Sequence, residues 1–378
     1  MSRIKTFKNR IRGVFYPWGI LVVIWCVSVA SRYLFNGLVY GLDFGIYQPD
    51  GIWYSLRTLQ WLGNSGQESA AQIISWYSTN SAKGSNFIQS DIFPVPKEVW
   101  GLVAPRILYS FFSIPFVLVL GMKGMLVIPA LSLLVLMVVS VLLGKTTGNL
   151  HIGFGLAILF STSPTILRWS ISNTTDSLLL GLFSIVAFCL YKLIHDPKML
   201  WILLLLVTLT NFTRFSFPMW VAISLVLFLK KLKVAALAIA IVNLITSIPV
   251  FYYQPEQAFL PLQQNQNLFT KLLTFPKSFI KIGFYEFAEI AVLDRLLLFF
   301  LIIAIIGALA RFREVDSLYF LSIFLAVWAL GAINGNIGVN FRYQLPVIPF
   351  GCLPFMAGLA YLREWYVRSA LNIIGKKT

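Results

Sequence analysis

The amino-acid sequence predicts an all-α membrane protein that crosses the bilayer about ten or eleven times, and three observations lead to this fold class. Hydrophobic residues make up 58% of the 378 residues and charged residues only 12%, about half the roughly 25% that is usual in soluble domains. The mean hydropathy is +0.80, and a soluble fold could not bury so much apolar surface. Third, many apolar runs have a length near that of a bilayer-spanning helix. We therefore expect one integral membrane domain over residues 1–378.

The apolar runs place the individual helices. The first run is long, follows a basic start and has no small-residue cleavage signal near its end, so we expect a true span there and not a signal peptide. Two runs, 106–121 and 199–213, are short for a bilayer and predict tilted or broken helices. The expected spans are residues 15–37, 106–121, 124–143, 151–167, 176–194, 199–213, 215–229, 234–253, 294–310, 317–333 and 345–362.

The basic residues orient these spans. The net charge of +16 comes from short clusters between apolar runs, as in loops at an anionic cytoplasmic leaflet, and does not indicate a nucleic-acid partner. By the positive-inside rule the N-terminus is cytoplasmic, and segments 38–105, 254–293 and 334–344 lie outside. The residues that define the cytoplasmic side are Arg3, Lys5, Lys8, Arg10, Arg12, Lys230, Lys231, Lys233, Arg311, Arg313, Arg363, Arg368, Lys376 and Lys377.

One stretch conflicts with this orientation. If Lys123 and Lys230 are both cytoplasmic, an even number of spans must separate them, but five hydrophobic segments do. We therefore expect one of the five, either 124–143 or 151–167, to be re-entrant or to form two halves of one bent helix.

Two long outer segments distinguish this chain from a simple helical bundle. The first outer loop, 38–105, is too apolar for a disordered linker, and its residues 51–62 repeat apolar side chains with helical period. This predicts an amphipathic helix on the outer membrane face. The second, 254–293, has a Gln- and Asn-rich turn followed by a basic amphipathic stretch with Lys271, Lys277 and Lys281.

The first candidate site is the acidic start of the first outer loop. The chain has only 14 acidic residues, and Asp43 and Asp50 lie in its Pro- and Gly-containing segment 41–54. A carboxylate at the outer surface can act as general base on a sugar hydroxyl. The alternative is that either side chain caps the following helix. The alternatives are evenly balanced for Asp43, while the position of Asp50 directly before the helix-period residues favours a functional role.

Three further segments carry charge at predicted helix ends. Asp176 opens an apolar run after a Pro-containing break and either complements the helix dipole or lines a polar cavity with Arg168. Arg214 interrupts an apolar stretch, where an ionisable residue is costly and indicates function, although it could snorkel to the interface. Arg342 and Tyr343 precede the last span, where Arg can hold a phosphate in forked geometry and Tyr adds a donor.

The sequence lacks the usual signatures of nucleotide-dependent, metal-dependent and serine-nucleophile enzymes. The sequence contains no P-loop, GxGxxG, HExxH or nucleophile elbow, so an enzyme of this kind would need an activated substrate already in the membrane. We expect no cofactor and no metal ligand set, with a divalent metal left as an open alternative.

In their order along the chain, these motifs resemble the GT-C glycosyltransferases. This superfamily includes protein O-mannosyltransferases, the lipid A aminoarabinose transferase and the mannosyltransferases of glycolipid anchors. The resemblance covers most of the chain as a set of short motifs in one order and on one side of the membrane. The residues that carry it are Asp50 and Tyr54; Ser163, Pro164, Thr175 and Asp176; Arg214; and Arg342, Tyr343, Leu345, Pro346 and Pro349.

The resemblance implies a specific activity. It implies inverting transfer of a sugar from a polyprenyl-phosphate-linked donor, with Asp50 or Asp43 as the base. Arg342, Tyr343 and, less securely, Arg214 would bind the donor phosphate. The implied substrate cavity contains Tyr54, Arg57, Arg168 and Asp176.

Two differences from protein O-mannosyltransferases narrow the range of expected acceptors. The chain lacks the paired Asp-Glu of protein O-mannosyltransferases in the first outer loop and has no large C-terminal soluble domain, so we expect a glycan or lipid acceptor. The expected location is the inner membrane of a bacterial cell, with the active site facing outside and membrane lipids around it. The competing functions are a polysaccharide polymerase and a transporter or flippase of lipid-linked glycans.

Overall fold

The computed structural model describes residues 17–35, 49–80, 92–95, 103–253, 268–334 and 342–375. Within these ranges the chain is helical and has no strand, which confirms the all-α fold class. Five helices are long and apolar enough to cross a membrane, and a pair bent by 68° would make a sixth. Four shorter apolar helices accompany them. The composition and these helices together identify a membrane protein.

The helices fall close to the expected apolar runs. The first helix is Pro17–Phe35, and each later predicted span contains one α-helix or, at 151–167, two. The bounds are α2 Pro49–Trp61, α3 Gly66–Asn80, α5 Leu108–Leu120, η2 Gly121–Leu126, α6 Val127–Thr146, α7 Leu150–Thr162, α8 Pro164–Ser170, α9 Thr175–Leu193, α10 Met199–Thr213, α11 Phe217–Leu229, α12 Lys233–Tyr253, α14 Leu268–Leu293, α15 Arg295–Ala310, α16 Val315–Asn334, η3 Arg342–Val347 and α17 Ile348–Gly375.

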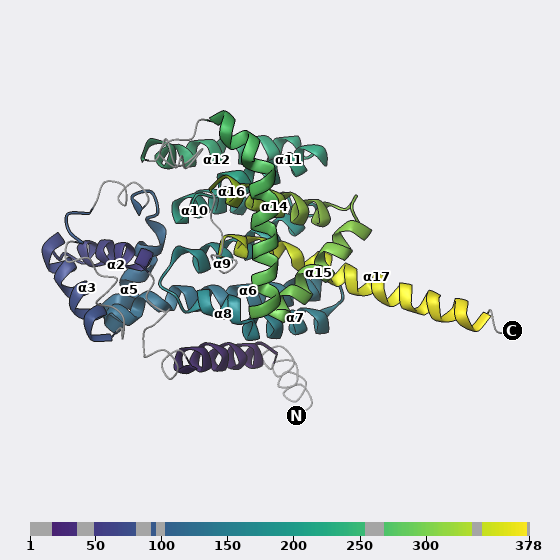
Figure 1. Ribbon diagram of the computed structural model, residues 1–378, viewed down its shortest axis with the longest axis horizontal. Coiled ribbons are helices and arrows are strands. Elements are labelled where there is room, and N and C mark those ends of the chain that lie inside the picture. Colours follow the sequence, from purple (N-terminus) through teal and green to yellow (C-terminus); the bar gives the residue numbers. More distant parts are fainter. Residues whose placement is uncertain are drawn as a thin grey trace, which may run out of the picture.

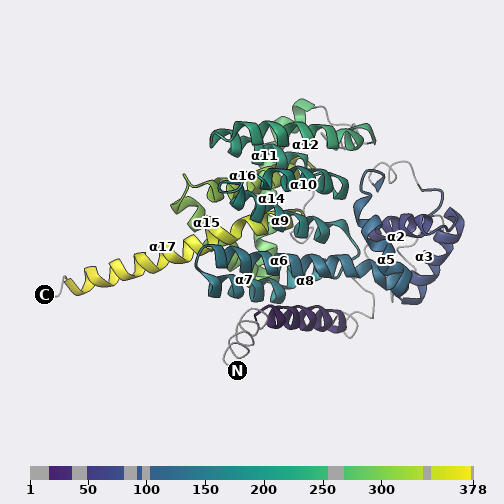
Figure 2. The same ribbon diagram turned by 180° about the vertical axis from the view of Figure 1, so that it is seen from behind.

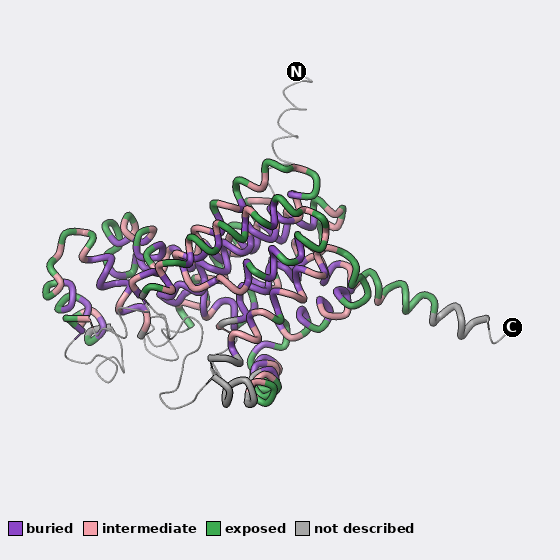
Figure 3. Tube along the Cα trace, turned by 90° about the horizontal axis from the view of Figure 1, so that it is seen from above, coloured by how far each residue is buried: buried purple, intermediate pink, exposed green. Residues whose placement is uncertain are grey.

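Most helices lie side by side along the long axis of the molecule (Figures 1 and 2). Helices α2, α3 and α5 form a separate group at one end of this bundle, which we call the end group. Helix α14 runs across the other helices. The first helix lies along one side, where the Trp25 indole nitrogen donates to the carbonyl of Ala130 at 2.7 Å. At the opposite end α17 extends beyond the bundle, and the protruding part is largely exposed (Figure 3).

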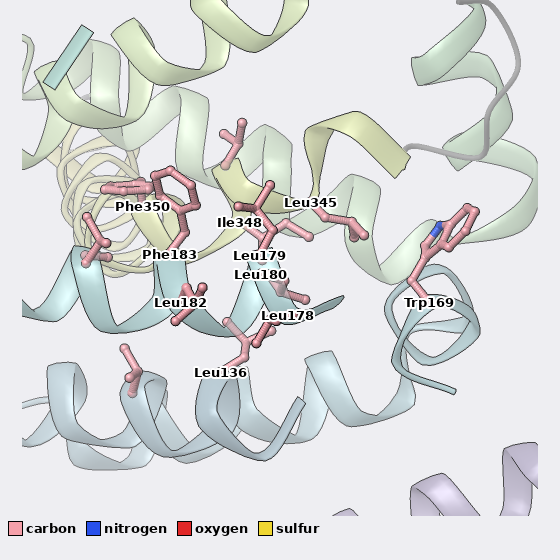
Figure 4. Close-up of a cluster of buried hydrophobic side chains, with 14 of the residues drawn as sticks. Leu136, Trp169, Leu178, Leu179, Leu180, Leu182, Phe183, Leu345, Ile348 and Phe350 are labelled. Atoms are coloured by element: carbon pink, nitrogen blue, oxygen red, sulfur yellow. The ribbon is translucent and has the colours of Figure 1, made fainter. Parts of the chain in front are cut away.

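Helix α9 lies at the centre of the bundle, because almost its entire surface is apolar and most of its residues are buried. Its leucines lie between Leu136 of α6 and the segment of Leu345 and Ile348 (Figure 4). The Phe183 ring contacts Phe350 and Trp220 with centroid distances of 6.0 and 5.8 Å. This packing fixes the start of α9, and with it Asp176, relative to η3.

The two ends of the bundle differ in charge. Helices α6 and α9 are parallel, because they approach each other near both their starts and their ends. An added Cβ on Gly181 would lie 3.0 Å from Ser132 near the two starts, and Leu143 and Leu190 near the two ends line one cavity. The start of α6 therefore lies at the same end as Asp176. At the other end the Lys230 ammonium donates to the carbonyl of Arg313. The basic α11–α12 and α15–α16 turns thus meet opposite Asp176.

This arrangement resolves the parity conflict. Lys123 belongs to η2, directly before α6, and so lies at the Asp176 end and not with Lys230. An odd number of segments, here five, is expected between two residues that lie at opposite ends of the bundle. One of the two segments expected to be irregular, 151–167, is indeed bent, because α7 and α8 meet at 68°. The conflict arose from the expectation that Lys123 and Lys230 lie at the same end of the bundle.

The bend between α7 and α8 is held by one buried carboxylate. Asp294, which is 2% exposed, accepts hydrogen bonds from the Ser163 hydroxyl and from the Thr165 amide at 3.0 Å. Its other oxygen accepts from the Leu297 amide at 3.0 Å. Asp294 therefore caps both α8 and α15, which satisfies amide groups that helix starts leave unpaired.

The end group departs from the sequence interpretation in two ways. Helix α2 forms as expected, but α3 and α5 cover it, so that most of its side chains are buried against protein. Helix α5, expected as the separate span 106–121, belongs with α6 to one apolar candidate span, Leu108–Thr146, and packs on α2 beside the bundle (Figure 1). Gly121, with φ of +60°, lets the chain turn sharply after α5, and Gly124 then contacts the backbone of Phe116.

The second outer segment contains a long helix, as its periodicity predicts. Helix α14 covers the basic stretch and rests on α16, where the Trp328 indole donates to the carbonyl of Phe279 at 2.8 Å. The side chains of Lys277 and Lys281 are exposed. Lys271 lies in the same helix, while residues 254–267 lie outside the described part of the chain.

Candidate functional site

Four charged side chains from four separate elements meet at the α2 end of the bundle. Arg342 donates from Nε to Oδ2 of Asp176 at 2.7 Å and from Nη2 to Oδ2 of Asp50 at 2.5 Å. Arg214 forms an ion pair with the other oxygen of Asp176. We call Asp50, Asp176, Arg214 and Arg342 the ionic cluster. It links α2, α9, the end of α10 and η3.

Local backbone structure places each member. Asp50 and Asp176 lie in the first turns of α2 and α9, where a carboxylate is favoured by the helix dipole. Arg214 is the extended residue that ends α10, and Arg342 begins η3. Each is therefore a helix-end residue, so the polar groups avoid the apolar interior of the bundle while remaining partly shielded.

Burial separates the two acids. The Asp176 side chain is only 2% exposed and those of Arg214 and Arg342 are 11% and 15% exposed, whereas Asp50 is 47% exposed. Asp176 is therefore the fixed centre that orients both guanidinium groups, since a buried carboxylate needs its charged partners. Asp50 is the member that can exchange its contact with solvent or a ligand.

The pKa of Asp50 is lowered by its neighbours. Burial acts to raise it, but the charge and hydrogen bond of Arg342, followed by the charges of Arg106 and Arg214, outweigh this effect. The result is a pKa below the ordinary value of 3.8, because cations favour the ionised carboxylate. In this arrangement Asp50 is a paired anion and a weak base.

An indole ring forms one wall of the cluster. The Arg342 guanidinium lies 5.1 Å from the centroid of Trp169, and the Arg168 guanidinium lies 5.5 Å from it. Trp169 is 3% exposed, so it supplies a rigid cation–π surface for Arg342. Arg168 could be selected from the sequence but Trp169 could not, since a Trp between apolar residues is ordinary core composition.

Tyr54 and Arg57 link α2 to the chain before α5. The Tyr54 hydroxyl accepts from Arg106 at 3.3 Å, and its ring contacts Tyr109 edge-on at 5.5 Å. Arg57 is 5% exposed and donates to the carbonyl of Val103 at 2.8 Å. These contacts hold the end group together. Arg106 was missed in the sequence, although like Arg342 it precedes an apolar run closely.

The turn before α9 positions α2. Asn173 is fully buried and donates to the Tyr77 hydroxyl at 3.0 Å. It lies so close to Gly51 that an added Cβ would overlap the Asn173 amide at 2.0 Å. The absence of a side chain at Gly51 thus allows the start of α2 to reach the turn, which brings Asp50 within range of Arg342.

Polar groups without partners surround the start of α9 and η3. The hydroxyls of Thr174 and Thr175 and the side-chain carbonyl of Gln344 are buried and have no hydrogen-bond partner within the described ranges. Buried polar groups are usually paired. These atoms therefore mark places where a water molecule or a substrate hydroxyl could form a hydrogen bond, or where a small movement of a neighbouring polar group would supply one.

The structure thus brings together four of the nine residues selected from the sequence, and places Arg168 beside them through Trp169. Tyr343 follows Arg342 in η3, and its side chain lies outside the described part, as does all of Asp43. In the part of the chain that is described, no three His, Cys, Asp or Glu side chains gather as metal ligands would.

The fold and the cluster define an all-α membrane protein with a charge-compensated polar site at one end of its bundle. In comparisons with known proteins, no family model matches this chain and no curated protein matches it.

Proposed function

We propose that this chain is a membrane glycosyltransferase that moves a sugar from a polyprenyl-phosphate donor to a glycan or lipid acceptor. The observation that supports it best is the convergence of Asp50, Asp176, Arg214 and Arg342 in one site at a bundle end. A carboxylate can deprotonate the acceptor hydroxyl, and two neighbouring arginines can stabilise a phosphate leaving group.

The arginine side chains of the site favour an anionic ligand. Asp50 and Asp176 pair with Arg342 and Arg214, while Arg106 influences Asp50 and Arg168 shares Trp169 with Arg342. Four guanidinium groups therefore lie in or beside the site, and forked arginine donors suit the oxygens of a phosphodiester.

Donor binding and base activation are coupled in this proposal. The donor phosphate takes over Nη2 of Arg342, which Asp50 now occupies at 2.5 Å. Because Asp176 is buried and remains bound to both arginines, Asp50 is the group displaced. Loss of the Arg342 contact returns the pKa of Asp50 toward its ordinary range, so the freed carboxylate becomes a better base only when the donor is bound.

The reaction then requires two bond changes. The acceptor hydroxyl oxygen attacks the anomeric carbon and forms the new glycosidic bond, while its proton moves to Oδ2 of Asp50. The bond between the anomeric carbon and the phosphate oxygen breaks, and polyprenyl phosphate leaves with the electron pair. Arg342 and Arg214 stabilise the added negative charge on the phosphate. Attack from the side opposite the phosphate inverts the configuration at the anomeric carbon.

We further propose a GT-C-like topology with the ionic cluster on the outer side of a bacterial inner membrane. The N-terminus would be cytoplasmic. The basic turns at Lys230 and Arg313 would be cytoplasmic too, which agrees with their position at the end opposite Asp176. A lipid-linked donor then reaches the cluster from the outer leaflet. The location of the cluster at a bundle end, away from the middle of the helices, favours transfer over transport across the membrane.

The test is a transfer assay with purified full-length chain in lipid nanodiscs, using radiolabelled polyprenyl-phosphate sugars and glycolipid acceptors. We expect single-sugar addition, and we expect Asp50→Asn to turn over at least about a hundredfold more slowly, as loss of a general base costs about 10²–10⁴ in rate. Donor binding should persist in this variant because Arg342 is freed. Glu364→Gln, on the exposed part of α17, is the matched control.

Three outcomes would change the proposal. Near-normal turnover in Asp50→Asn with loss in Asp43→Asn transfers the role of base to Asp43. Activity in both variants removes the acidic loop from the mechanism. Products with many added repeats in place of one sugar would identify a polysaccharide polymerase.

A further inference from the structure

A cavity lies at the opposite end of the bundle from the ionic cluster. It has a volume of about 370 Å³ and lies among the ends of α6 and α9, the start of α16 and the first half of α17. Tyr191 lines it near the end of α9, 15 residues after Asp176, which places the cavity roughly 22 Å along the helix axis from the cluster. The cavity is therefore independent of the proposed transfer site.

The cavity has an apolar interior and a charged rim. Side chains such as Leu190, Phe350 and Leu353 form its walls, while Arg311, Glu314 and Asp316 lie at its edge. Arg311 and Glu314 are 49% and 57% exposed, so this edge faces the surroundings of the protein. Its volume lies within the range typical of small-molecule sites, which are mostly apolar with a few placed polar groups.

One negative charge at the rim is left over. Glu314 pairs with Arg311 at 3.8 Å. The half-buried Asp316 accepts from backbone amides at the start of α16 and lies in the field of Arg311 and Glu314, but forms no ion pair within the described ranges. Among the residues that line the cavity, one cation, Arg311, therefore faces two carboxylates. The Lys230 ammonium, which donates to the carbonyl of Arg313 on the same turn, is not one of the lining groups.

A polar group deeper in the cavity points to the same ligand chemistry. Tyr319 lies one helical turn beyond Asp316, lines the cavity and is 5% exposed. Its hydroxyl has no hydrogen-bond partner in the described part of the chain. Residues three apart share one helix face, so the carboxylate and the Tyr319 side chain line the same wall.

We infer that this cavity binds an amphipathic primary amine, with the ammonium group on Asp316 at the rim and the apolar body between α9 and α17. The ammonium would complete the charge balance that Arg311 leaves open. Tyr191 also lines the cavity, and an aromatic ring at such a site can add a cation–π contact. The amine could come from a soluble alkylammonium compound or from the aminoethyl headgroup of a phospholipid, and both share this chemistry.

The test uses purified full-length chain in detergent, titrated with octylammonium, octan-1-ol and octanoate and followed by native mass spectrometry and thermal unfolding. We expect octylammonium to bind at least tenfold more tightly than the neutral and anionic probes. Asp316→Asn should lose at least tenfold in affinity, while Glu364→Gln, on the exposed part of α17 and outside the cavity lining, should change it less than threefold. Ala357→Phe should fill the cavity and abolish binding in a protein that unfolds cooperatively.

Equal binding of octylammonium and octan-1-ol, or full affinity in Asp316→Asn or Ala357→Phe, would overturn the inference. Nanodiscs containing phosphatidylethanolamine or phosphatidylglycerol separate the two sources. Selective retention of phosphatidylethanolamine, lost in Asp316→Asn, identifies the lipid headgroup. Octylammonium binding without retained lipid identifies a soluble amine. Transfer activity is not part of this readout, so the result is independent of the proposed function.

Discussion

Arg342 donates a 2.5 Å hydrogen bond to Asp50 across 292 residues of sequence. This contact occupies the carboxylate proposed as base with the cation proposed to hold the donor phosphate. The two groups cannot perform those functions while they remain bound to each other. Ligand binding and base activation are therefore expected to be one linked event.

Replacement of Arg342 should affect both structure and donor binding. Arg342→Ala leaves the buried Asp176 with Arg214 alone, and breaking a buried pair by removing one partner costs about 3–5 kcal/mol. Arg342→Lys keeps the charge but lacks the fork that reaches both carboxylates. We expect the Lys variant to fold with a lower melting temperature and to need roughly tenfold more donor for half-maximal rate. Unchanged donor dependence in the Lys variant would remove Arg342 from the phosphate site.

The Asp50–Arg342 pair should make stability depend on pH at its acidic limit. The pKa of Asp50 is lower in the folded protein than the ordinary value of 3.8. The pair therefore stabilises the fold fully above pH 3.8, and this stabilisation is lost as the pH falls through the lower pKa of the folded state. Asp50→Asn lacks this contribution at every pH. The difference in melting temperature between the two proteins, measured from pH 6 downward, should shrink below about pH 4. A constant difference would mean that the pair does not form in solution.

Gly51 should be intolerant of a side chain. In Gly51→Ala the new Cβ overlaps Asn173, which is buried and bound to Tyr77 and so cannot move away cheaply. Overpacking of this kind costs about 1–3 kcal/mol, and displacement of the adjacent Asp50 should also slow turnover. Gly155→Ala is the matched control, since open space surrounds Gly155 within α7 and Ala should stabilise that helix by about 0.5–1 kcal/mol. Similar stability of both variants would contradict the close approach of α2 to the turn.

The proposed sidedness can be tested by cysteine labelling. Cys189 and Cys352 are buried, so a background with only Cys26→Ala suffices. Gln67→Cys, exposed on α3, should react with an impermeant maleimide in intact cells, and Arg313→Cys should react only after permeabilisation. The reverse pattern would place the ionic cluster on the cytoplasmic side and rule out an outer-face transferase.

The sequence by itself determined the helices and most of the charged residues of the site. Apolar runs fix helices locally, because each run satisfies its own backbone hydrogen bonds. Asp176, Arg214 and Arg342 could be selected because an ionisable residue beside an apolar run is costly and so requires a reason. Trp169 could not be selected because a Trp between apolar residues is ordinary core composition, whereas Arg106 precedes an apolar run as Arg342 does and was missed despite this signal.

Only the tertiary structure decided which of these residues meet. Asp176 and Arg342 are 166 residues apart, and helical periodicity within each segment carries no information about the packing between segments. The same limit explains Lys123, whose charge alone suggested the cytoplasmic side, whereas the parallel packing of α6 and α9 places it at the Asp176 end. It also explains α2, whose apolar face could be covered equally well by lipid or by α3 and α5. Local pattern fixes which surfaces must be buried, and long-range packing selects what buries them.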